Sequence, residues 1–346
     1  MTEITGHLEI ATDYSAFKPT TDSTSIDRAE QIETLNYYLS ENQVVFVDGS
    51  KNIGKTTLLS QFLANNQRNS IAIFLNEANT ISLIDNDIYK DIYIQIRMYT
   101  NEFTNDDLDK NIKMSDLIQI YKTLSYYLRI KKKQMFFILD GFENLKGNES
   151  QFLDNLLFNL PQNPEVKFLV STADKELNSK MIIKKSKVYS VPVLTKSQIQ
   201  LILPDADQEQ INLITQSFHG KPDSISIIAR LLKQGVTIND ILQNPSQETN
   251  ILYITEWNTA VVDDVQKELI GFLAFSNQTI TINDLCICCN ENESEIIKII
   301  QSISFIQTKE KQVEFVSYGH KKFSQEKLIE NKISFLDKII HLIKTE

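Results

Sequence analysis

The sequence predicts an α/β fold, in which a parallel sheet with helices on both faces is followed by a helical subdomain and a winged-helix domain. In the first half of the chain, short apolar runs of strand length alternate with amphipathic segments. This alternation is typical of parallel strands that are buried on both faces. After about residue 190, helices follow one another without a strand between them, and near the end three helices precede two alternating runs. That last order predicts a winged helix.

The length and composition favour several folded domains. The chain has 346 residues, of which 42% are hydrophobic and 23% charged, which excludes an intrinsically disordered protein. At roughly 100–200 residues per domain, two or three domains are expected. We expect a polar N-terminal arm (1–25), the α/β domain (26–190), the helical subdomain (191–250), the winged-helix domain (251–323) and a C-terminal helix (324–346).

The elements follow from hydrophobic spacing. A helix begins after Arg28, with Ile32, Leu35 and Leu39 on one face. Four apolar runs rich in β-branched and aromatic residues predict strands at 44–47, 71–75, 135–139 and 166–170, and the clearest helix between them is 115–130. Further helices are expected at 196–203, 208–218, 222–233, 237–243, 257–275, 283–289, 293–304 and 324–344, and a hairpin at 305–308 and 313–316.

Charge and cysteine content limit the partners and the compartment. Lys and Arg number 35 and Asp and Glu 45, giving a net charge of −10, which disfavours a surface built as a whole to hold nucleic acid or anionic lipid. No apolar stretch reaches the ~20 residues of a membrane span, and residues 1–7 do not resemble a secretory signal. The three cysteines crowd into 286–289, so no disulfide framework is expected. We therefore expect a cytoplasmic protein with no membrane partner.

The strongest motif in the chain is an unbroken G-x-x-x-x-G-K-T run at 49–56, between a predicted strand and a predicted helix. Its glycines allow consecutive backbone N–H groups to point into one concavity at the helix N-terminus. Lys55 can then reach the β- and γ-phosphates, and the Thr56 hydroxyl can ligate Mg²⁺. The predicted nucleotide-binding residues of this loop are Gly49, Ser50, Asn52, Ile53, Gly54, Lys55, Thr56 and Thr57.

Three polar residues follow other predicted strands. Asp140 ends a buried strand, where a carboxylate is costly unless something binds it, so we predict that it holds the Mg²⁺. Glu143 is a candidate to polarise the attacking water, although an exposed loop glutamate is equally common. Thr172 ends another strand and is a candidate to sense the γ-phosphate if that strand neighbours Asp140; a merely polar strand end is the alternative.

These residues resemble the STAND branch of the AAA-like P-loop NTPases (signal-transduction ATPases with numerous domains), which includes the NACHT and NB-ARC immune switches. The resemblance covers roughly 26–330. The segment around Arg28 is similar to the family's opening segment, whose backbone lies against the adenine, and Asp140-Gly141-Phe142-Glu143 is similar to the second motif of NACHT-type members. Gly220-Lys221-Pro222 resembles a G-x-P signature whose proline packs on the base. A helix start with proline at its first position is the alternative for Pro222.

The resemblance also implies a role for His320 and a mode of action. His320 sits where family members place a winged-helix histidine that contacts the β-phosphate of ADP; a surface or core histidine is the alternative. ATP or ADP and Mg²⁺ are the implied cofactors. The implied function is a signalling switch, in which ADP holds a closed state, Mg·ATP promotes opening and self-association, and slow hydrolysis resets the protein. Bacterial antiviral defence or stress signalling is the implied setting, with an unidentified sensor or effector protein as a further partner.

Two departures and two alternatives accompany this interpretation. The first departure is that family members carry an arginine where this chain has Ala173-Asp174, a difference that would affect the hydrolysis rate. The second is that few residues lie before or after the part of the chain that resembles the family. One alternative is an ATPase similar to the origin-recognition AAA+ proteins, which would bind DNA through the winged helix. Acidic residues dominate its expected recognition helix, so nucleic acid is not the partner we expect. The other alternative is a scaffold that binds nucleotide without hydrolysing it.

Overall fold

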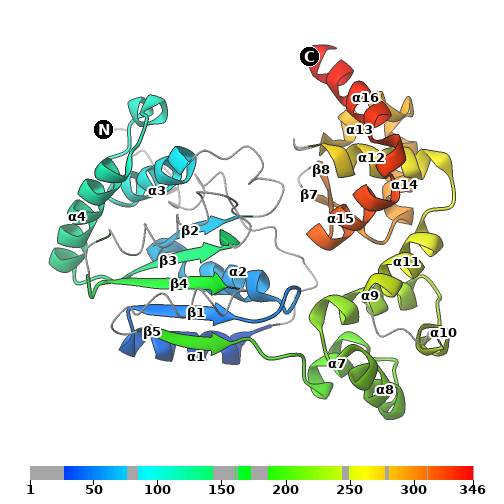
Figure 1. The fold of residues 1–346 in the computed structure, drawn as a ribbon, viewed down its shortest axis with the longest axis horizontal. Coiled ribbons are helices and arrows are strands. Elements are labelled where there is room, and N and C mark those ends of the chain that lie inside the picture. Colours follow the sequence, from blue (N-terminus) through cyan, green and yellow to red (C-terminus); the bar gives the residue numbers. More distant parts are fainter. Residues whose placement is uncertain are drawn as a thin grey trace, which may run out of the picture. The chain divides into compact units, whose positions relative to one another are not determined.

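A computed structural model of the chain describes residues 27–75, 85–142, 160, 163–172, 186–243, 249–276, 280–309 and 311–345. The chain forms two compact units, Met1–Pro192 and Val193–Glu346, called unit 1 and unit 2 below (Figure 1). The expected N-terminal arm, Glu143 and the pair at 173–174 lie outside the described residues. No helix within the described ranges is both long enough and apolar enough to cross a membrane.

Unit 1 is built on a five-stranded parallel sheet, which confirms the predicted α/β fold of this part of the chain. Its strands lie in the order β2-β3-β4-β1-β5. Their bounds are β1 (Val44–Asp48), β2 (Ser70–Phe74), β3 (Met135–Asp140), β4 (Val166–Thr172) and β5 (Ser186–Ser190). Four of them coincide with the predicted strands. The fifth, β5, was not predicted, because it is a half-exposed edge strand without a continuous apolar run.

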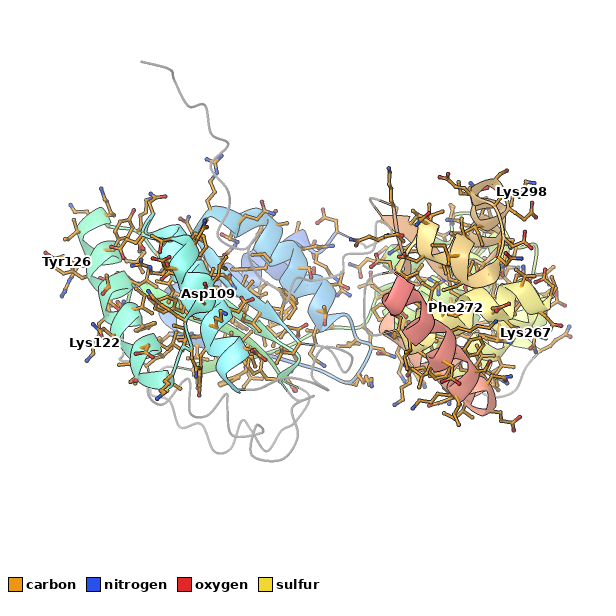
Figure 2. The ribbon with its side chains drawn as sticks, turned by 90° about the horizontal axis from the view of Figure 1, so that it is seen from above. Asp109, Lys122, Tyr126, Lys267, Phe272 and Lys298 are labelled. Atoms are coloured by element: carbon orange, nitrogen blue, oxygen red, sulfur yellow. The ribbon has the colours of Figure 1, made fainter. Side chains whose placement is uncertain are left out.

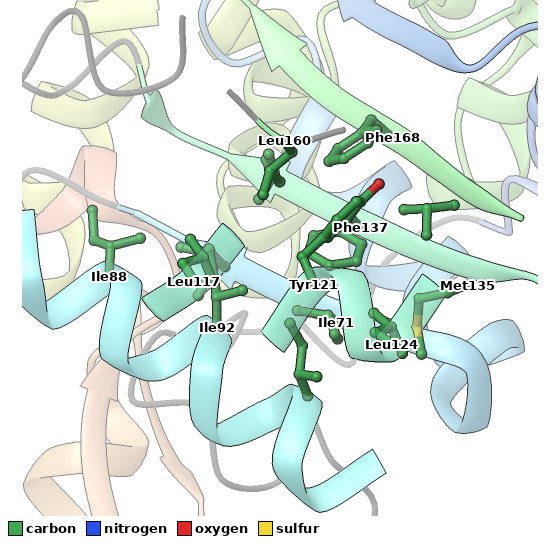
Figure 3. Packing of buried hydrophobic residues seen from close by; sticks show 14 of the residues in the cluster. Ile71, Ile88, Ile92, Leu117, Tyr121, Leu124, Met135, Phe137, Leu160 and Phe168 are labelled. Carbon is green, nitrogen blue, oxygen red and sulfur yellow. The ribbon is translucent and has the colours of Figure 1, made fainter. Parts of the chain in front are cut away.

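Helices cover both faces of this sheet, as parallel strands require. The helices α1 (Ala29–Glu41) and α2 (Lys55–Asn66) pack on the face that carries Val45 and Val47. The helices α3 (Asp85–Tyr99) and α4 (Met114–Lys131) pack on the other face, where Tyr121 and Phe137 lie at the centre of the core (Figure 3). Short 3-10 turns cover Gln67–Asn69 and Asn105–Asp109. The outer face of α4 is polar, although Tyr126 on it is 60% exposed (Figure 2).

Unit 2 begins with a run of helices. These are α7 (Lys196–Ile202), α8 (Gln208–Phe218), α9 (Pro222–Lys233), α10 (Ile238–Leu242) and α11 (Thr249–Ala260). We call α7 to α10 the helical subdomain. Thr195, Asp207 and Thr237 start α7, α8 and α10, and in each case the side chain accepts a hydrogen bond from the backbone N–H three residues on. These caps explain why the short helices could be located from sequence.

The remainder of unit 2, called the C-terminal subdomain, combines helices with a small antiparallel sheet in the order β6-β8-β7. Its strands are β6 (Ile280–Thr281), β7 (Ile306–Lys309) and β8 (Gln312–Phe315). Its helices are α12 (Asp264–Phe275), α13 (Ile282–Cys289), α14 (Glu293–Ser302), α15 (Tyr318–Lys327) and α16 (Lys332–Thr345), with a 3-10 turn at Ile329–Asn331. The predicted hairpin corresponds to β7 and β8.

Two predicted helices were wrong because each is divided in two. The expected helix 257–275 is interrupted at 261–263, since Asp263 caps α12 by accepting a hydrogen bond from Gln266 N, and the Gln266 side chain accepts one from Asp263 N. The expected helix 324–344 is instead α15, which starts at the cap Ser317, and α16. Buried Leu328 ends α15 with non-helical backbone angles. Hydrophobic spacing continues through both breaks, which is why they were missed.

An apolar cluster that includes Trp257, Phe272, Phe305 and Phe335 forms the core of the C-terminal subdomain. Trp257 comes from α11 and stacks on Phe305 at a centroid distance of 6.0 Å. Helix α11 is therefore anchored in this core. The core is tight at Gly271, where an added Cβ would lie 2.3 Å from Phe335 Cζ.

Candidate nucleotide-binding site

The loop 49–56 joins β1 to α2 at the carboxyl edge of the sheet. Three of its residues, Gly49, Asn52 and Gly54, have positive φ angles of 158°, 66° and 92°, and the last two turn the chain sharply before the helix. Gly54 is the residue that precedes α2, and it has no side chain with which to cap that helix N-terminus. Uncapped N–H groups and the helix dipole make such a terminus a binding place for an anion. Thr57 belongs to the first turn of α2.

The backbone of this loop is closely packed, and Lys55 folds back over it. An added Cβ on Gly49 would lie 2.8 Å from Ile53 Cγ2. The Ile53 N–H donates to the Ser50 carbonyl at 3.3 Å. The ammonium of Lys55, a residue only 8% exposed, donates to the carbonyls of Gly49 at 2.7 Å and Ser50 at 3.4 Å. The backbone of the loop thus holds the Lys55 ammonium, a cation that would attract a phosphate chain.

Thr56 and Asp140 meet at this edge although 84 residues separate them in sequence. The Thr56 hydroxyl donates to Asp140 Oδ2 at 2.6 Å. Asp140 is the last residue of β3 and is 3% exposed, whereas Thr56 is exposed. A hydroxyl and a carboxylate are hard oxygen donors of the kind that Mg²⁺ takes beside phosphate oxygens. The donor set therefore fits Mg²⁺.

The strand β4 lies between β3 and β1, and the hydroxyl next to the end of β3 is that of Ser171. Its Oγ accepts a hydrogen bond from Gly141 N at 3.1 Å. Thr172, the residue chosen from sequence, pairs in register with Asp48 of β1. The sequence predicted a hydroxyl beside Asp140 but not the register of β4 against β3. In the structure, that register places Ser171 beside the end of β3. A sensing role for Thr172 stays a prediction.

Arg28 is buried in unit 1, at 2% exposure, and immediately precedes α1. Its backbone N–H donates to Gln61 Oε1 at 2.9 Å, which ties the start of α1 to α2. Burial lowers the pKa of the guanidinium, which lies near Tyr189 of β5. This segment is thus held against the helix that follows the loop. A contact of Arg28 with the nucleotide stays a prediction.

The remaining predicted nucleotide contacts, Pro222 and His320, belong to unit 2. Pro222 is the first residue of α9, a position where its missing N–H costs nothing, so its placement agrees with the alternative weighed from sequence. His320 lies in the first turn of α15 and is 3% exposed. Its Nδ1 lies 2.8 Å from Ser317 Oγ and its Nε2 2.8 Å from Glu256 Oε2. The structure thus gives both ring nitrogens protein partners.

Sequence reasoning did not find Glu256 or Arg230, the two charged partners that face His320. Glu256 is fully buried, and Arg230 Nε donates to its Oε1 at 2.7 Å. The available signal was a single acidic residue within the apolar stretch Leu252-Tyr253-Ile254-Thr255-Glu256-Trp257. A lone acid in such a stretch requires a buried partner.

The cysteines lie on α13 and are half-buried. Burial raises the pKa of the Cys288 thiol to about 11 and that of Cys289 to about 12, so both are protonated at neutral pH. Within the described ranges, no group of three or more His, Cys, Asp or Glu side chains is placed to hold a metal ion.

With this geometry in place, comparison with known proteins identifies the family. Residues 26–226 match the family described as an ATPase domain predominantly from Archaea. The chain belongs to this family. It is therefore an ATPase, and it carries the P-loop motif found in the sequence. No curated protein matches the chain.

Solved structures show the same fold at low sequence identity. A STAND protein with a tetratricopeptide repeat sensor from Pyrococcus horikoshii is 12% identical, with a TM-score of 0.62, over 95% of this chain and 47% of that one. The chain thus spans about half of that protein's length. A Walker-type ATPase of Pyrococcus abyssi is 11% identical, with a TM-score of 0.52, over 90% of this chain and 99% of that one.

Proposed function

We propose that the chain is a nucleotide-driven signalling switch of the STAND kind. In this proposal ADP holds a closed state, and exchange for Mg·ATP promotes opening and self-association. Slow hydrolysis then resets the protein. We place this switch in bacterial antiviral defence or stress signalling, with a sensor or effector protein as the partner. A ligand changes such an equilibrium only through its different affinities for the two states.

One observation carries the nucleotide part of the proposal. The Thr56 hydroxyl and the Asp140 carboxylate, from two different elements, meet at 2.6 Å beside the loop whose backbone holds the Lys55 ammonium. A turn with an incidental lysine would not need a buried carboxylate directly beside it. The arrangement combines an ammonium, an uncapped helix terminus and two oxygen ligands, which are the groups needed for a phosphate chain and its metal.

Each residue has a distinct role in the proposed cycle. Lys55 and the backbone of 49–54 hold the β- and γ-phosphates, while Thr56 and Asp140 hold Mg²⁺, which when bound neutralises phosphate charge. Glu143 orients the attacking water, and Thr172 responds to the γ-phosphate. We assign Arg28, Pro222 and His320 to contacts with the nucleotide. Because Ala173-Asp174 replaces the arginine of family members, we expect hydrolysis to be slow.

Nucleotide titration of a Lys55→Ala variant tests the site. Removing the ammonium from the loop should weaken ATP and ADP binding by at least about tenfold, since charge-assisted contacts to phosphate are among the stronger hydrogen bonds. Lys51→Ala is the matched control, because it removes a cation from an exposed position of the same loop. Equal ATP affinity in the Lys55→Ala and wild-type proteins would show that the assignment of the site is wrong.

Light scattering tests the switch itself. The wild-type chain should be monomeric with ADP and larger with a non-hydrolysable ATP analogue. The same mass in both samples would contradict the switch. Phosphate release then separates the switch from a scaffold that only holds nucleotide: the wild type should release phosphate slowly and the Asp140→Asn variant should release none. No turnover by either protein would favour the scaffold.

A further inference from the structure

Unit 2 contains a fully buried carboxylate, that of Glu256, which is hydrogen-bonded to three other residues. Glu256 on α11 accepts hydrogen bonds at both oxygens: Oε1 from Arg230 Nε at 2.7 Å and Ser304 Oγ at 2.8 Å, and Oε2 from His320 Nε2 at 2.8 Å and Arg230 Nη2 at 3.3 Å. Burial alone would raise the pKa of Glu256, but the hydrogen bond from His320 and the charge and hydrogen bonds of Arg230 lower it to about 2. Glu256 is therefore ionised throughout the neutral range.

The four groups come from different parts of unit 2. Arg230 lies on α9 of the helical subdomain, Ser304 precedes β7, and His320 lies on α15. Helix α11 is anchored in the apolar core of the C-terminal subdomain through Trp257. Glu256 therefore connects α9 to the C-terminal subdomain through charge.

Two further polar pairs join α9 to α11. Tyr253 donates its hydroxyl to Asp223 Oδ2 at 2.7 Å, and the hydroxyls of Ser224 and Thr249 lie 3.2 Å apart. Buried polar contacts gain less over their hydrated, separated state than apolar packing of equal area does. Separation of α9 from α11 would break these polar pairs together with the contact between Arg230 and Glu256, whereas Trp257 would keep α11 in the core of the C-terminal subdomain.

The protonation of His320 follows from its partners. Because an ionised carboxylate only accepts, His320 Nε2 carries a hydrogen and donates it to Glu256. Arg230 Nη2, at 3.2 Å from the same nitrogen, therefore brings a positive charge against a donor and not a hydrogen bond. Nδ1 accepts from the Ser317 hydroxyl at 2.8 Å in the neutral ring. Burial lowers the pKa of His320, and the charge of Arg230 lowers it further, against the opposing effects of Glu256 and Asp223.

We propose that His320 takes up a proton from solvent when α9 separates from α11, so that docking of α9 and the charge of His320 are linked. Separation removes Arg230 and leaves Glu256 as an anion beside a neutral ring. A proton at Nδ1 restores the charge balance, and the Ser317 hydroxyl changes from donor to acceptor. The groups that face the ring are Arg230 and Asp223 from α9, Glu256 and Tyr253 from α11, and Ser317 from its own helix. The titration of His320 needs no nucleotide, so its outcome can be distinguished from the outcome of the nucleotide tests above.

The titration of His320 by nuclear magnetic resonance, in the full chain labelled at histidine, tests this linkage. The chain has four histidines, and the signal of His320 is the one that is missing from the spectrum of a His320→Gln variant. In the wild type His320 should titrate below the ordinary histidine value of about 6.5, and in Arg230→Met above it, because the charge of Arg230, which lowers the pKa, is then removed while that of Glu256, which raises it, stays. Lys233→Met is the matched control, since it removes an exposed cation from the same helix and should leave the wild-type titration unchanged.

The same titration of His320 in the wild type and Arg230→Met would overturn the proposal. If Arg230→Met does not fold, hydrogen exchange of the wild type decides. Since the separated form binds the extra proton, the amides of α9 should open more at pH 5.5 than at pH 7.5, after correction for intrinsic exchange and relative to α4 of unit 1 in the same sample. Equal protection of α9 at both pH values would likewise overturn it.

Discussion

Replacing Gly54 with alanine should weaken nucleotide binding without unfolding the protein. Gly54 has a φ of 92°, a backbone conformation that residues other than glycine rarely adopt. Holding a residue there costs of order 1–3 kcal/mol. Without ligand the variant loop can relax to a less strained shape, so nucleotide must restore the strained one. Since each 1.4 kcal/mol is tenfold in affinity, the ADP dissociation constant should rise roughly 5- to 150-fold.

Calorimetric titration of ADP measures this effect, and Gly235→Ala is its control. Gly235 has a φ of 87°, and an added Cβ there would meet nothing within 4 Å, so alanine imposes the same kind of strain without a clash. Gly235 follows α9 in unit 2 and belongs to no predicted nucleotide contact. The control should therefore lose some thermal stability and keep its ADP affinity. If folded Gly54→Ala binds ADP within twofold of wild type, the loop does not depend on this backbone geometry.

Three further outcomes follow from particular side chains. Asp140→Asn should keep nucleotide binding within about tenfold but abolish Mg²⁺-dependent phosphate release, measured by a coupled phosphate assay; undiminished release would refute its metal role. Gly271→Ala should lower the free energy of unfolding by about 1–3 kcal/mol in denaturant titration, since its Cβ would overlap Phe335, and an unchanged midpoint would show that the ring moves aside. Asp107 is buried, which opposes its charge, but hydrogen bonds from Lys110, Thr104 and Arg97 lower its pKa to about 2, below the ordinary aspartate value of 3.8. Its stabilising effect is present above pH 3.8 and lost towards pH 2, so acid titration should bring wild type and Asp107→Asn together in stability. A constant difference across that range would contradict this.

Local patterns were sufficient for the part of the site that is contiguous in sequence. The loop 49–56 is defined by its own glycines and by the strand and helix beside it, so its conformation needs no distant information. The meeting of Thr56 with Asp140 followed only from the rule that parallel strands bring their carboxyl ends to one edge. The choice between Ser171 and Thr172 depended on the register of β4 against its neighbours, which hydrophobic spacing does not determine.

Features that depend on distant partners were missed for physical reasons. The strand β5 gains its stability by pairing with β1, not from its own composition, so it carried no signal of its own. The break between α11 and α12 depends on the cap at Asp263, a residue type that also occurs inside helices. Glu256 was missed because the four hydrogen bonds that its carboxylate accepts come from residues 26 to 64 positions away in sequence.

The two polar centres of the chain differ in exposure, and this difference bears on what each can do. Thr56 is exposed at the loop, so a solvated ligand can reach it, and its attraction for phosphate must weaken as salt screens the charges. Glu256 and His320 are buried, so no solvated ion reaches them while α9 is docked, and their mutual interaction is screened far less. A proton can be exchanged at this buried pair when the junction opens briefly. The exposed loop is therefore suited to bind a ligand from solution. The proposed protonation of His320, in contrast, depends on whether α9 is docked on α11.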